Sequence, residues 1–115
     1  MPLTIDLASE LAEWPDVHFE LAASKSPSEG DREQFDQLLS GWYLVGFYGG
    51  YGPATLGRGV LHNMTEPSYT KDDQGFSAKW RVDMGSVPDH ALDVMIRALE
   101  GWSERSLPGA KLTVR

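Results

Sequence analysis

Residues 76–84 carry the feature that most constrains the fold of this chain, an unbroken alternation of apolar and polar side chains. The apolar set is Phe76, Ala78, Trp80, Val82 and Met84, and the polar set is Ser77, Lys79, Arg81 and Asp83. A period of two residues is typical of a strand with one buried face and one solvated face. The chain therefore contains at least one strand of a half-buried sheet.

Two segments have the period of an amphipathic helix instead. In the segment 87–104, the apolar stripe consists of Leu92, Met95, Ile96, Leu99 and Trp102. Ser86 is the expected N-cap of this helix, and Pro88 stands in its first turn. The other helix is expected at 29–40, where Ser28 and Asp31 have the spacing of a capping box. Gly41 is expected to end it.

Four further segments are expected to be strands. Residues 17–23 and 110–115 alternate between apolar and polar in the same way as 76–84. Residues 42–48 (WYLVGFY) are apolar on both faces, which is typical of a central strand covered on both sides. Residues 58–66 form the next strand, which Pro67 ends.

The N-terminal segment has two interpretations. The spacing of Leu7, Leu11 and Trp14 favours a short helix over 6–14 that stops at Pro15. The alternative is an extended conformation for residues 4–7 (TIDL).

The predicted order is β-α-β-β-β-α-β, and 115 residues suffice for one domain spanning 1–115. We expect an α+β fold with a mainly antiparallel sheet of about five strands and two helices on one face. This architecture resembles a ferredoxin-like α/β sandwich with an added strand. The resemblance is architectural, so it implies no functional residues.

The charge distribution argues against nucleic acid as a partner. The whole net charge of −7 arises from the first 40 residues, which carry nine acidic and two basic side chains. Such a segment repels phosphate backbones, and the chain has no RNP-like motif. It also has no apolar run of the roughly 18 residues that a membrane span needs, and its start lacks the basic and apolar regions of a signal peptide. A cytoplasmic location is the expectation.

No cofactor or metal is expected. The chain has no cysteine, and the three histidines, His18, His62 and His90, share no metal-ligand spacing. The glycine-rich stretch 49–59 contains G-x-x-x-x-G-R, but a phosphate-binding loop ends in Lys-Ser/Thr and opens a helix. Here Arg58 is expected to open a strand, so nucleotide binding is not predicted.

The aromatic residues around 42–51 are the best candidate for a functional surface. In a strand, Tyr43, Val45 and Phe47 lie opposite Trp42, Leu44 and Tyr48, and helices on one side of the sheet cover only one of these sets. The other set is then covered either by the N-terminal segment or by a partner. The residues predicted to contact a partner are Tyr43, Phe47, Tyr48, Tyr51, Arg58 and His62.

These observations favour a non-enzymatic protein-binding or regulatory domain that self-associates, with a homodimer as the simplest case. The alternative is a small enzyme or ligand-binding domain with a pocket between the glycine-rich loop and His62. Pro2 offers one enzymatic variant, because an N-terminal proline acts as a base in tautomerases. Those enzymes need a long helix soon after that proline, which Pro15 would interrupt.

Overall fold

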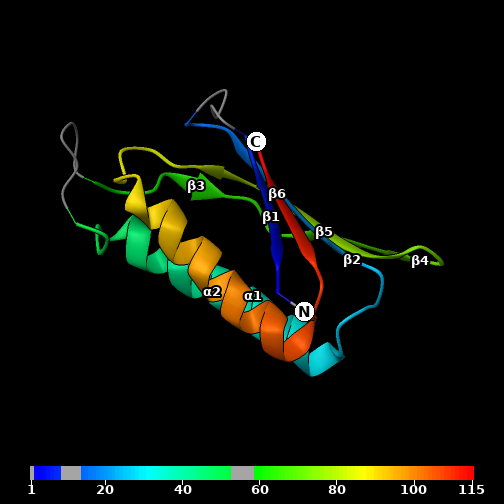
Figure 1. The fold of residues 1–115 in the computed structure, drawn as a ribbon. Coiled ribbons are helices and arrows are strands. Elements are labelled where there is room, and N and C mark those ends of the chain that lie inside the picture. The colour runs from blue at the N-terminus through cyan, green and yellow to red at the C-terminus, as the bar shows by residue number, and fades with distance from the viewer. Residues whose placement is uncertain (1, 9–13, 53–58) are drawn as a thin grey trace.

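A computed structural model describes residues 2–8, 14–52 and 59–115 (Figure 1). Two helices, α1 (Glu29–Phe47) and α2 (His90–Ser106), cover one face of a six-stranded sheet. The strands are β1 (Thr4–Leu7), β2 (Val17–Ala23), β3 (Asn63–Met64), β4 (Ser68–Asp72), β5 (Gly75–Asp83) and β6 (Lys111–Val114). The predicted α+β class is confirmed, with six strands in place of about five.

The strand order is β1-β6-β2-β5-β3, and β4 also pairs with β5. All of these pairings are antiparallel except that of β1 with β6, which is parallel. The sheet therefore has two edges, formed by β1 on one side and by β3 together with β4 on the other.

The edge formed by β3 and β4 is interrupted at residues 65–67. There the Thr65 N–H donates to the Arg81 carbonyl at 2.9 Å, and the Thr65 hydroxyl accepts from the Arg81 N–H at 2.9 Å. The Thr65 hydroxyl thus accepts the hydrogen bond that a backbone carbonyl of the edge strand would accept in a regular β-ladder. Pro67, which has no N–H, stands in the break, and such breaks discourage pairing with further strands.

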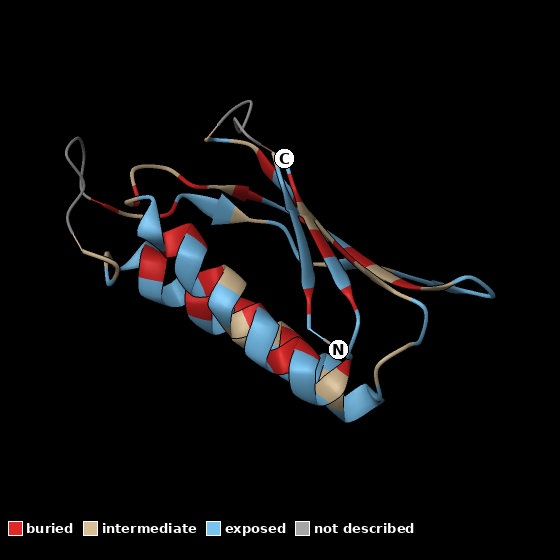
Figure 2. Cartoon of the chain, in the orientation of Figure 1, coloured by how far each residue is buried: buried red, intermediate tan, exposed pale blue. Residues whose placement is uncertain are grey.

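The core lies between the sheet and the helices (Figure 2). Phe19 stacks on Trp80 at 5.3 Å between ring centroids, and the Phe35 ring meets Trp80 edge-on at 5.4 Å. Two indole N–H groups tie the helices together at opposite ends. Trp42 donates to the Ala91 carbonyl at 2.8 Å, and Trp102 donates to the Asp31 carbonyl at 3.0 Å.

The prediction of a strand at 42–48 is wrong, because these residues form the C-terminal turns of α1. The buried stripe of α1 is Phe35, Leu39, Trp42 and Gly46, which continues the helical spacing through Gly41 without a break. Burial of this stripe against the core outweighs the strand preference of the aromatic and β-branched residues.

Two other expectations need correction. The structure describes residues 59–66 of the predicted strand 58–66, and of these only Asn63–Met64 is a strand. Two further backbone hydrogen bonds precede it along the chain: the Val60 carbonyl accepts from the Ser86 N–H, and the His62 N–H donates to the Asp83 carbonyl. Ser86 does not cap α2, because that helix begins at His90. The Ser86 hydroxyl instead accepts hydrogen bonds from the backbone N–H groups of Gly59 and Val60.

At the N-terminus the extended alternative holds for residues 4–7, which pair with β6. The rest of the predicted helix 6–14 includes residues 9–13, which lie outside the described residues. In contrast, the Ser28 cap is confirmed, since its hydroxyl accepts from the Asp31 N–H at 3.1 Å.

Candidate functional site

The C-terminal end of α1 exposes a group of large apolar side chains. Its members are Leu44, Val45, Phe47 and the C-cap residue Tyr48. We call these four residues the α1-end patch. Tyr48 is 79% exposed and Leu44 is 53% exposed. An aromatic ring and aliphatic methyl groups are therefore in contact with solvent at the end of the helix. Contiguous exposed apolar surface of this kind is typical of interaction sites.

The patch lies within an unusual stretch of sequence. Residues 37–57 contain no Asp, Glu, Lys or Arg. The aromatic rings in this stretch contact each other, with 5.8 Å between the ring centroids of Tyr43 and Phe47 and 5.1 Å between those of Phe47 and Tyr48. The patch is therefore uncharged as well as apolar.

A close backbone contact beneath the patch holds the end of α1 in place. The Leu61 N–H donates to the Gly46 carbonyl at 3.0 Å, and a Cβ at Gly46 would lie only 2.7 Å from the Leu61 Cγ. The Tyr51 hydroxyl donates to the Trp42 carbonyl at 2.8 Å, and burial raises the pKa of Tyr51 to about 12. The patch thus rests on a well-packed base.

The structure brings together only part of the predicted partner surface. Tyr43, Phe47 and Tyr48 share the end of α1, whereas the Tyr51 hydroxyl turns inward to the Trp42 carbonyl. His62 is exposed, and its backbone carbonyl accepts from the Tyr43 hydroxyl at 3.3 Å. Arg58 lies outside the described residues.

The predicted partner residues did not include Leu44 and Val45, which the strand assignment placed on opposite faces of the sheet, so that only one of them was expected to be open. The absence of charge over 37–57 was the signal that could have marked them. In a helix whose buried stripe is already complete, further apolar residues must point to solvent.

A groove of about 580 Å³ lies beside the patch, between α1 and the segment 64–69. We call it the α1–β4 groove. Its lining residues are Asp36, Leu39, Ser40, Tyr43, Leu44, Met64, Thr65, Glu66, Pro67 and Tyr69. The Tyr69 hydroxyl donates to the Asp36 carboxylate, which ties α1 to β4. Leu44 belongs both to this groove and to the α1-end patch.

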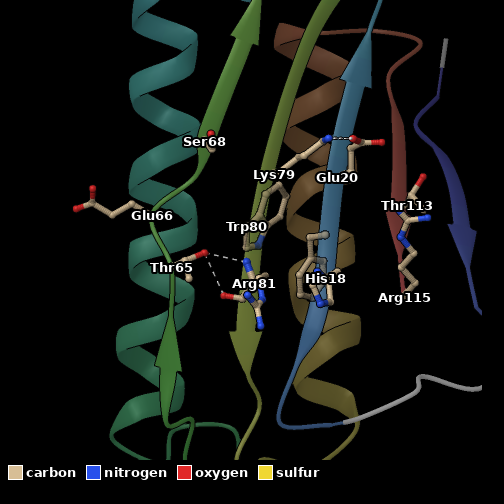
Figure 3. A pocket seen from close by; sticks show the side chains of 11 residues that line it. His18, Glu20, Thr65, Glu66, Ser68, Lys79, Trp80, Arg81, Thr113 and Arg115 are labelled. Carbon is tan, nitrogen blue, oxygen red and sulfur yellow. Dashed lines mark hydrogen bonds and ion pairs between the residues drawn. The ribbon is translucent and has the colours of Figure 1, made fainter.

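The helix-free face of the sheet has a different character (Figure 3). A concavity of about 520 Å³ lies there, over β2 and β5, and Glu66 is among its lining residues. Several charged residues in and around it form ion pairs. Glu20 lies 3.3 Å from Lys79, and Asp16 lies 2.8 Å from Arg81 and 3.3 Å from His18. The hydrogen bond from Arg81 lowers the pKa of Asp16. This face is a solvated ladder of cross-strand ion pairs rather than an aromatic surface.

The monomeric alternative expected the N-terminal segment to lie across this face, but residues 4–7 do not, and residues 9–13 lie outside the described residues. Instead β1 extends the sheet at its edge, where Thr4 and Ala8 bond the backbone of Ala110 and Val114. The next described element after β1 is the strand β2, not the long helix that a tautomerase-like arrangement around Pro2 requires.

Metal-ligating clusters and membrane-spanning helices are both absent from residues 2–8, 14–52 and 59–115. Within these residues, no three His, Asp or Glu side chains are grouped so as to hold a metal ion. No helix among them has the length and apolar character needed to cross a bilayer.

Comparisons of the chain with models of protein families, with curated proteins and with solved structures find no match. The function therefore has to be argued from the surfaces described above.

Proposed function

We propose that this chain is a non-enzymatic protein-binding or regulatory module that self-associates through the α1-end patch. The observation that carries the proposal is the joint exposure of Leu44, Val45, Phe47 and Tyr48 in an uncharged stretch. Removing apolar surface from water contributes about 25 cal/mol per Å². Phenylalanine and tyrosine are also enriched at the centres of protein interfaces.

A second copy of the chain is the partner that the charge distribution favours. In a two-fold contact the same patch of both copies meets itself, so a patch with charges of one sign would repel its copy. The net charge of −7 arises in the first 40 residues, and the patch itself holds no charge. Long-range repulsion between copies is therefore weak where the two surfaces meet, and salt screens what remains.

Light scattering after size-exclusion chromatography tests the proposal. We expect a dimer at concentrations of about tens of micromolar, corresponding to a modest affinity. Tyr48→Lys places a charge in the patch and should give a monomer. The fold should survive, because a cation at the C-terminal end of a helix interacts favourably with its dipole.

Leu7→Lys is the matched control. Leu7 is also an exposed apolar residue, but it lies on β1, at the opposite edge of the sheet from β3 and β4. We expect this variant to remain dimeric. A monomeric unmodified protein contradicts self-association. If Leu7→Lys dissociates the dimer and Tyr48→Lys does not, the interface lies on β1 and not at the end of α1.

A further inference from the structure

Within the described part of the chain, Asp36 and Glu66, the acidic residues of the α1–β4 groove, make no ion pair of the kind that Asp16 and Glu20 make. Glu66 lies at the border of the groove, because it also lines the concavity on the helix-free face. Asp36 and Glu66 line the groove, and no Lys, Arg or His lines it with them. Among the described residues, neither carboxylate has a basic group within 4.0 Å, whereas Asp16 and Glu20 both do. Figure 3 shows Glu66 pointing outward from the edge of the sheet, away from the basic side chains of β5. The groove thus has two carboxylates without an ion-pair partner within 4.0 Å among the residues described, of which Asp36 accepts a hydrogen bond from the Tyr69 hydroxyl.

The walls of the groove suit an apolar group and a cation together. Leu39, Leu44, Met64 and Pro67 provide aliphatic surface, and Tyr43 and Tyr69 provide aromatic rings. A cation over an aromatic ring is attracted by the negative face of the ring. The chain already uses this interaction, since the Arg32 guanidinium lies 5.3 Å from the Tyr69 ring centroid. Arg32 lines a different hollow, together with Lys71 and Phe76, and not the groove.

Two local features create the space. The pairing of the edge with β5 is interrupted at 65–67, and α1 presents a small residue, Ser40, to the groove. The resulting volume of about 580 Å³ falls within the range of roughly 300–1,000 Å³ that is usual for small-molecule sites.

We propose that the α1–β4 groove binds an organic ammonium ion with an apolar body. Its hydrocarbon part lies against Tyr43, Leu44 and Met64, and its ammonium group faces the carboxylates of Asp36 and Glu66. The binding function goes beyond self-association and does not depend on it, because nine of the ten lining residues lie outside the α1-end patch.

Titration with 2-phenylethylammonium, followed by two-dimensional amide NMR, tests this site. The neutral comparator is 2-phenylethanol, and the anionic comparator is 3-phenylpropanoate. We expect saturable shifts at Ser40, Tyr43, Met64 and Glu66. The ammonium compound should bind roughly tenfold more tightly than the alcohol, because its positive charge is attracted to the two carboxylates, whereas the alcohol offers them only a neutral donor. The carboxylate should bind most weakly.

Two variants locate the binding. Glu66→Gln removes one charge without changing the shape of the groove and should weaken binding about fivefold to tenfold. Ser40→Leu fills the groove and should weaken the ammonium compound and the alcohol equally. Glu104→Gln, an exposed acidic residue of α2, is the control and should bind like the unmodified protein.

The same titration in Tyr48→Lys separates this site from self-association, since Tyr48 does not line the groove. If the amide signals of the groove residues shift saturably in the Tyr48→Lys variant, the result supports the proposal, whether that variant is a monomer or a dimer. The proposal is overturned if the shifts fail to saturate or map outside the groove. Equal binding of 3-phenylpropanoate, or unchanged affinity in both Glu66→Gln and Ser40→Leu, also overturns it.

Discussion

Helices α1 and α2 pack side by side on the same face of the sheet, yet they present different surfaces to solvent (Figure 1). The exposed residues of α2 are mainly charged: Asp93, Arg97, Glu100, Glu104 and Arg105. The C-terminal end of α1 exposes the uncharged α1-end patch instead. Each helix buries one apolar stripe against the core. The solvent-facing positions of the two helices are not constrained by core packing. The difference between their exposed surfaces therefore points to function rather than to folding.

The same substitution on the two helices should give the largest contrast. Leu99 of α2 is fully buried, and Leu99→Ala should lower the free energy of unfolding by about 2–5 kcal/mol through lost contacts and a cavity. Leu44→Ala on α1 should cost less than about 0.5 kcal/mol, because Leu44 is exposed. Chemical denaturation at concentrations too low for association measures both. Equal losses would show that Leu44 is a core residue and remove the basis for the patch.

Glycines within α1 sharpen the comparison between its buried and exposed faces. Gly46→Ala should destabilise the fold by about 1–3 kcal/mol, because the added methyl group overlaps the buried side chain of Leu61. Gly41→Ala should stabilise it by about 0.5–1 kcal/mol, since a Cβ there meets no atom within 4 Å. Thermal unfolding of the two variants measures the difference. A stable Gly46→Ala protein would mean that the end of α1 is not held against Leu61.

The helices also begin differently. Ser28 caps α1 through its side chain, whereas Asp89 at the start of α2 makes no such bond. Ser28→Ala should therefore cost about 1 kcal/mol. Asp89→Ala should lose only the interaction of its charge with the helix dipole, about 0.5 kcal/mol. Denaturant midpoints compare the variants, and a larger loss for Asp89→Ala would reverse the assignment of caps.

The last contrast depends on pH and concerns Tyr51, whose hydroxyl donates to the backbone of α1. Burial raises its pKa from 10.0 to about 12 in the folded state. The folded protein holds this proton more tightly than the unfolded chain, so the stabilisation is complete below pH 10 and is lost as the pH rises from about 10 to 12. The difference in unfolding free energy between the unmodified protein and Tyr51→Phe should shrink over that range. A difference that stays constant between pH 9 and 12 would place the Tyr51 phenol in solvent.

Where one periodicity dominated a segment, sequence reasoning located the element. The alternation of 17–23 and 76–84 marked β2 and β5, and the stripe from Leu92 to Trp102 marked α2. Residues 42–48 were misassigned because aromatic and β-branched residues favour strands locally. Only the packing of Trp42 and Gly46 beneath the helix end resolves that ambiguity. Of the residues predicted to contact a partner, Phe47 and Tyr48 belong to the α1-end patch and Tyr43 lines the groove beside it, all at the end of a helix rather than on a strand.

The sequence by itself determined the α+β class, the Ser28 cap, the position of the negative charge and the aromatic stretch that includes the patch. These properties depend on local spacing and composition, which need no information about distant residues. The tertiary structure alone decided that α1 continues to Phe47, that β1 joins the sheet edge, and that Asp36 and Glu66 line one groove. Each of these depends on contacts between segments far apart in the chain, where burial overrides local preference and the break at residues 65–67 leaves room beside α1.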